Sequence, residues 1–292
     1  MSNIGVVCFA SSYAVALALE ISRLFFRSGI RGALMIIFAA AGFLAQTLFL
    51  VARLTESNAS GWLDWYLLAA WILVAAYLYL TFYHPQNPIG IFILPIVLAL
   101  IGAAYLLPDA RGFTVGASAW GLVHGLALLL GTTVILIGFV SGLMYLIQSA
   151  RLKQKRAVWS RLRLPSLEWA EKITGRCIVI SAVLLGVGVF SGIAINAQSG
   201  KVPWTDPVVW GSGLLLLWLA VVMVFNMVYR PARGGRKIAY LTLASMVFLL
   251  LVLALTQLIP SEHPGRITTI APNASTAMRD HLEQYQGGGG AA

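Results

Sequence analysis

The sequence predicts an all-α, polytopic membrane protein with eight transmembrane helices and both chain ends on the outer side. Of its 292 residues, 59% are hydrophobic and only 10% are charged, whereas about a quarter are charged in a typical soluble domain. Apolar runs of about 20 residues, long enough to cross a bilayer, recur along the chain. These runs lack the alternation of a barrel strand, and a helix satisfies its own backbone groups in lipid, so helices are predicted.

The apolar runs are separated by short polar segments, which sets the expected bounds of the spans. The predicted spans are 4–26, 32–52, 62–84, 88–107, 120–148, 176–198, 208–229 and 237–259. Together they predict one transmembrane domain over residues 1–259. Residues 260–292 are polar, end in "QGGGGAA" and are expected to form a disordered external tail.

The first spans carry few polar residues. No basic region precedes the first run, and Arg23 and Arg27 follow it, so we expect a retained span rather than a cleaved signal peptide. Glu20 lies within one helical turn of Arg23 and is expected to pair with it. The third span ends in "FYHPQNP", which contains His84.

The later spans carry most of the other signals. The fifth begins with "WGLVHG", and "GVGVFSG" in the sixth predicts close helix packing through small residues. Between these spans, residues 151–172 alternate basic and apolar residues. They form either an interfacial helix broken at Pro165 or a solvated loop. Before the seventh span, Asp206 can cap the helix and Pro207 can occupy its first turn.

Lys and Arg residues predict the orientation. With the N-terminus outside, fifteen of the 20 fall in inner segments and five in outer segments, which is the bias expected of cytoplasmic loops. The formal net charge of +10 is then explained by topology and by affinity for anionic lipid at the inner leaflet. A nucleic-acid partner is not needed to explain it.

Histidines are the most informative candidates for chemistry. His124 lies near the outer end of the fifth span and His263 just beyond the eighth, while His84 is at the inner end of the third. A histidine near a membrane helix marks a ligand site, a proton path or a packed hydrogen bond. Two outer imidazoles fit the axial positions of a haem iron. The alternative for His124 is a hydrogen-bonded interfacial residue.

A haem bound there would need flat apolar walls and cationic partners for its propionates. Trp120, Trp204 and Trp210 lie on the predicted outer face, and Arg111, Lys201 and Arg266 are possible propionate partners. Tryptophan is also enriched at membrane interfaces for reasons unrelated to ligands, so both interpretations of these residues stay open.

The order of these features resembles the transmembrane cytochrome c assembly family, which includes CcsA, CcmC and the HemX-like proteins. The matching segments run from "HPQNPIGIFILP" through "WGLVHGLALLLGTTVILIGFVSGLMYLIQSARLK" to the "WTDP" loop and "YRPARGGRKIAYLTLASMVFLLL". They span about His84 to His263. The short loop resembles most the HemX-like branch.

The resemblance implies haem b as cargo or ligand and a set of site residues. His124 and His263 correspond to the family's outer iron ligands, and His84 to one inner ligand. Trp204 and Asp206 belong to the tryptophan-rich loop, which here is reduced. The second inner histidine falls at about Tyr229, or at Asn226, and is therefore missing.

Two functions follow from the resemblance. The first is a haem-handling subunit of cytochrome c biogenesis in the plasma membrane of a prokaryote, with apocytochrome c and other biogenesis membrane proteins as partners. The second is a HemX-like scaffold or regulator of haem biosynthesis that carries no haem. No nucleophile–base arrangement and no phosphate-binding loop is visible in the sequence, so we do not expect an enzyme in its own right.

Overall fold

Eight α-helices make up the regular structure of the residues that the computed structural model describes, which are 2–25, 29–55, 62–83, 88–106, 119–154, 165–198, 207–228 and 235–258. The all-α prediction is confirmed for these residues. The helices are α1 (Ser2–Phe25), α2 (Gly29–Thr55), α3 (Trp62–Tyr83), α4 (Gly90–Leu106), α5 (Ala119–Gln154), α6 (Leu167–Gln198), α7 (Pro207–Val228) and α8 (Gly235–Leu258).

Six helices, α1, α2, α3, α5, α6 and α7, are long and apolar enough to cross a membrane within the described residues. The apolar helix α4 is shorter, with 17 residues. A multi-pass membrane protein is therefore supported, while the count of eight spans and the orientation stay predictions.

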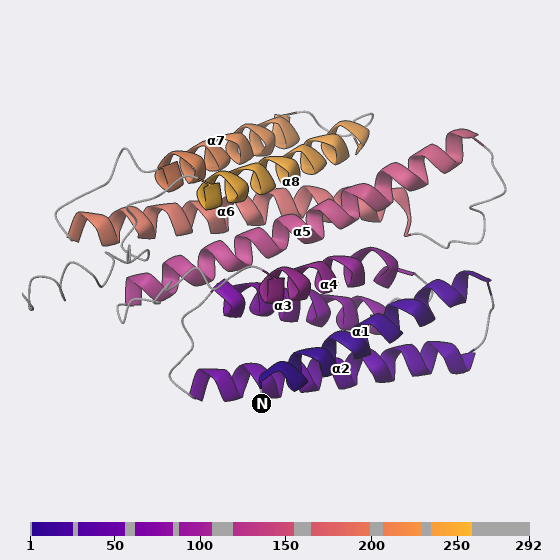
Figure 1. Ribbon diagram of the computed structural model, residues 1–292. Coiled ribbons are helices and arrows are strands. Elements are labelled where there is room, and N and C mark those ends of the chain that lie inside the picture. Colours follow the sequence, from indigo (N-terminus) through magenta and orange to yellow (C-terminus); the bar gives the residue numbers. More distant parts are fainter. Residues whose placement is uncertain are drawn as a thin grey trace, which may run out of the picture.

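The helices lie in two layers, α1–α4 and α5–α8, with their axes roughly along one direction (Figure 1). Long helix α5 joins the layers: Leu136, Val140 and Met144 pack into the core formed with α1–α4, whereas Ile135 packs with α6, α7 and α8. Because α5 contributes to both cores, its middle part is held from two sides.

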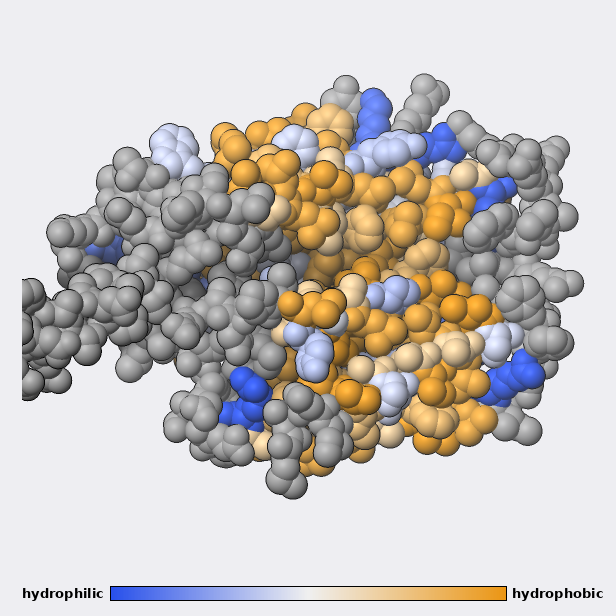
Figure 2. All heavy atoms as spheres, in the orientation of Figure 1, coloured by the Kyte–Doolittle hydropathy of each residue, from blue (hydrophilic) through white to orange (hydrophobic). Residues whose placement is uncertain are grey.

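An apolar band covers the face of the molecule shown in Figure 2, and the strongly hydrophilic residues lie toward the two ends of the bundle. Large apolar side chains such as Leu48, Phe190 and Met227 are exposed. A soluble monomer rarely exposes such a continuous apolar surface, whereas a bilayer requires it.

The bounds of α5 and α6 correct the prediction for residues 151–172. Residues up to Gln154 continue α5, and α6 begins at Leu167, nine residues before the predicted 176. Ser166 caps α6: its Oγ accepts a hydrogen bond from the Trp169 backbone N–H at 3.3 Å. Pro165 therefore precedes a helix start and does not interrupt one interfacial helix over 151–172. Residues 155–164 lie outside the described part.

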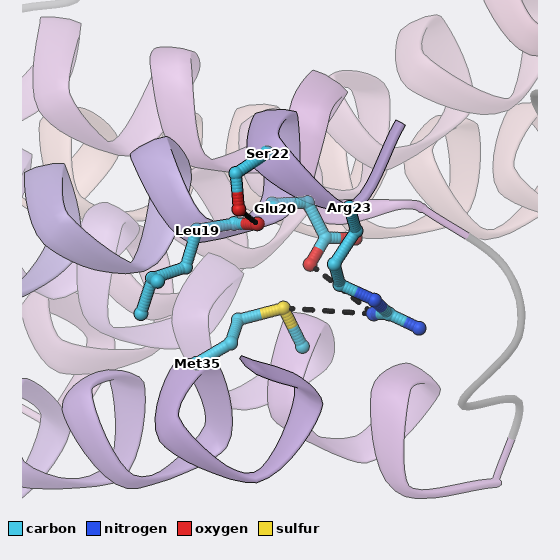
Figure 3. A network of polar contacts seen from close by, with 5 residues as sticks. All are labelled: Leu19, Glu20, Ser22, Arg23 and Met35. Atoms are coloured by element: carbon cyan, nitrogen blue, oxygen red, sulfur yellow. Dashed lines mark hydrogen bonds and ion pairs between the residues drawn. The ribbon is translucent and has the colours of Figure 1, made fainter. Parts of the chain in front are cut away.

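The predicted pair of Glu20 and Arg23 is confirmed (Figure 3). Arg23 Nη1 lies 3.6 Å from Glu20 Oε2, and Glu20 is only 1% exposed. The same guanidinium nitrogen lies 3.7 Å from Met35 Sδ of α2. The Glu20 carboxyl also lies near the backbone N–H of Gly90, the first residue of α4. A carboxylate is favourable at the N-terminus of a helix, so this position brings α1 and α4 into polar contact.

Candidate functional site

Three of the predicted site residues, Trp120, His124 and Trp210, lie in the described part of the chain. The other four, together with the three possible propionate partners, lie outside the described residues: His84, Trp204, Asp206 and His263, with Arg111, Lys201 and Arg266. The site can therefore be built from the N-terminal end of α5.

The His124 imidazole is half-buried and held by a backbone atom of the neighbouring helix. His124 Nδ1 lies 2.6 Å from the carbonyl oxygen of Gly188 in α6. A carbonyl oxygen only accepts hydrogen bonds, so Nδ1 is the protonated nitrogen. In the neutral imidazole the lone pair is then on Nε2. Histidines that bind metals are oriented by this kind of hydrogen bond from their other nitrogen.

Glycine residues allow the two helices to approach closely at this level. A Cβ at Gly192 would lie 2.8 Å from His124 Cε1, and one at Gly188 would lie 2.6 Å from Leu128 Cδ2. The prediction that "GVGVFSG" permits close packing is confirmed at both positions. Sequence reasoning missed their second role: the same glycines position the His124 ring.

Trp65 of α3 was also missed. Its Cη2 atom lies 2.6 Å from the position of a Cβ on Gly125, the residue that follows His124. The side chain therefore fills the space left by that glycine and places an aromatic ring beside the histidine turn. The signal in the sequence was Gly125 itself, which leaves room for a large neighbour directly after His124.

The two described tryptophans of the predicted outer face are exposed. Trp120 lies one turn before His124 on the same side of α5 and is 49% exposed. Trp210, in the first turn of α7, is 70% exposed. Exposed tryptophans at helix ends are typical of an interfacial belt. Because Trp120 precedes His124 by four residues in the helix, it can in addition lie beside a group bound at His124. The expected position of Pro207, the first residue of α7, is confirmed.

At the other end of the bundle, Asn226 of α7 faces α6. Its side-chain nitrogen would lie 3.4 Å from a Cβ on Gly175, an ordinary contact distance. Tyr229, the other position at which a second inner histidine was expected, lies outside the described residues. The structure therefore places an amide at this end of α7.

A comparison with protein families shows to which family the chain is related. The family described as "Cytochrome C assembly protein" matches residues 59–261, more than two thirds of the chain. This chain belongs to the cytochrome c assembly protein family. The match begins before α3 and ends after α8, so it extends the resemblance beyond its predicted start at His84. Searches of curated proteins and of solved structures find no match.

Family membership supports a role in cytochrome c biogenesis, alongside other biogenesis components, for this multi-pass membrane protein. Helices α1 and α2 precede the matched region. They pack on the family core through α4 and α3.

Proposed function

We propose that this member of the family handles haem b for cytochrome c maturation and presents it to apocytochrome c. In this proposal the protein lies in the plasma membrane of a prokaryote, with both ends outside, and is closest to the HemX-like branch. His124 and His263 hold the iron on the outer side, and Trp120, Trp204 and Trp210 line the porphyrin together with Asp206 of the loop.

The geometry of His124 is the observation that supports this proposal. Its Nδ1 donates to the Gly188 carbonyl at 2.6 Å, which sets Nε2 as the nitrogen with the lone pair. The missing side chain at Gly192 leaves room for the ring against α6, and Trp65 of α3 fills the space beside Gly125, the residue after His124. A residue that already has a fixed ring and a set tautomer loses little freedom when it binds a metal.

The inner side is proposed as the weaker site. His84 would be its one histidine, because Tyr229 or Asn226 stands where the family has a second. The alternative function, a HemX-like scaffold without haem, is favoured by this loss and by the reduced tryptophan-rich loop.

The absorption spectrum of the purified protein from haem-replete cells tests the proposal. We expect a Soret band with low-spin features, because two imidazoles give a six-coordinate iron. His124→Ala should remove the low-spin spectrum, and added imidazole should restore part of it. His281→Ala, a histidine replacement in the tail, is the matched control and should change nothing.

Two results would contradict the proposal. A colourless wild-type preparation from haem-replete cells would favour the scaffold. An unchanged spectrum with normal cytochrome c maturation in both His124→Ala and His263→Ala would eliminate the outer site.

A further inference from the structure

An open apolar groove lies between α7 and α8, near the ends at which α7 finishes and α8 begins. Its volume is about 390 Å³, and it is lined by Trp218, Val221 and Phe225 of α7 and by Lys237, Tyr240 and Leu241 of α8. The groove is separate from the sites described above: His124 lies at the opposite end of the bundle, and Asn226, at the same end as the groove, faces Gly175 of α6 and does not line it.

The groove extends from the helix ends toward the middle of the bundle. Phe225 is in the last turn of α7 and Lys237 in the first turn of α8. Trp218 lies ten residues before the end of α7, which is about 15 Å along the helix axis. Its indole is fixed there, because Nε1 donates to Ser245 Oγ at 2.9 Å and the ring stacks on Phe248 with centroids 6.0 Å apart.

The residues along the sides of the groove are exposed at the surface of the bundle. Val221 is 56% exposed and Tyr240 is 61% exposed. Lys237, at the end of the groove, is exposed as well. The lining is thus apolar over its length and has a cation at one end.

Positive charge dominates this end of the bundle. Among the side chains that the structure describes there, the basic ones outnumber the acidic ones; the basic ones are Arg23, Arg31, Arg151, Lys172, Arg176, Arg236 and Lys237, and the acidic ones Glu20, Glu168 and Glu171. Arg236, next to Lys237, donates from Nε to Ser149 Oγ of α5 at 2.7 Å. This bond holds the start of α8 against α5 and so fixes the position from which Lys237 extends.

We propose that the groove is a binding site for one anionic phospholipid, with an acyl chain between α7 and α8 and its phosphate at Lys237. Lipid tails are as apolar as the groove, so burial of a tail does not by itself select an occupant. Selection then depends on the head group. A phosphate carries the charge that complements Lys237 and the surrounding basic residues.

Trp218 can report the occupant directly, because bromine atoms on an acyl chain quench tryptophan fluorescence on contact. The full chain is reconstituted in phosphatidylcholine vesicles that contain a minor fraction of either brominated phosphatidylglycerol or brominated phosphatidylcholine. The Trp218 contribution is the difference in quenching between wild type and Trp218→Phe, which keeps the ring stacking. We expect the brominated anionic lipid to quench Trp218 with an apparent affinity about fivefold higher than the neutral lipid.

Variants separate a specific site from diffuse attraction. Lys237→Gln should abolish the preference for the anionic lipid at Trp218, whereas Lys172→Gln, an exposed lysine at the same end on α6, should preserve it. Trp210, exposed at the other end of α7, should be quenched equally by both lipids. Equal quenching of Trp218 by the two lipids, or an equal loss in Lys172→Gln and Lys237→Gln, would overturn the proposal. Neither result depends on whether the protein binds haem.

Discussion

The direction of the His124 side chain is set in part by a backbone carbonyl and by the lack of a side chain at a neighbouring glycine. Its Nδ1 lies 2.6 Å from a main-chain carbonyl, that of Gly188, and its ring occupies space that a Cβ at Gly192 would take. Substitution of the glycines is therefore a more selective probe of the site than removal of the histidine.

We expect Gly192→Ala to lower haem content while Gly213→Ala leaves it unchanged. Alanine is favoured over glycine inside a helix by about 0.8–1 kcal/mol, and at Gly213 no heavy atom lies within 4 Å of the new Cβ. At Gly192 the Cβ would lie 2.8 Å from His124 Cε1, so the ring must move and its bond to Gly188 must weaken. The ratio of Soret absorbance to protein in the two variants measures the effect. Equal ratios would show that the orientation of His124 does not matter for haem.

At the scale of the helices, α1 is linked to the matched family region by packing and by one buried charge. The Glu20 carboxyl lies near the Gly90 N–H at the start of α4 and beside Arg23 of its own helix. The N-terminal hairpin of α1 and α2 therefore has a polar contact with the family region in addition to its apolar core.

Glu20→Ala should lower the free energy of unfolding by about 2 kcal/mol, because it removes a buried side chain and its contact with Arg23. Glu20→Gln should cost less, since it keeps the volume of the side chain and its amide oxygen can still accept from Arg23. Thermal melts in detergent compare these variants with Glu168→Gln, which removes an exposed acid from the first turn of α6. If Glu20→Ala and the Glu168→Gln control unfold at the same temperature, the contact of α1 with α4 depends on apolar packing alone.

At the scale of the whole molecule, the two layers meet at α5, and the charged ends of the bundle define its axis. The basic end contains the ends of α1, α5 and α7 and the starts of α2, α6 and α8. Such a distribution predicts that this end faces the cytoplasm.

Cysteine labelling in intact cells tests that orientation. Cys8 is exposed and Cys177 is buried, so Cys8→Ser provides the background that an impermeant thiol reagent requires. On this background Ser160→Cys should resist the reagent and Thr268→Cys should react, because the positive-inside bias places them on opposite sides. Reaction at Ser160→Cys before cell lysis would reverse the topology.

The class of the protein, and the positions of most of the eight helices among the described residues, follow from the amino-acid sequence alone. These are local properties: an apolar run of sufficient length is a helix in lipid whatever its neighbours are. Three further features could likewise be interpreted from a few neighbouring residues. They are the spacing of Glu20 and Arg23, the position of Pro207 before an apolar run, and the glycines of α6.

Which residues meet depends on how the helices pack. His124 and Gly188 are 64 residues apart, and their contact depends on the register of α5 against α6. Hydropathy could not place the ends of these two helices, because Arg151–Gln154 and the first turns of α6 are polar although helical. The groove likewise forms where Trp218 and Phe225 of α7 lie opposite Tyr240 of α8. No pattern within either helix specifies how the two helices are aligned.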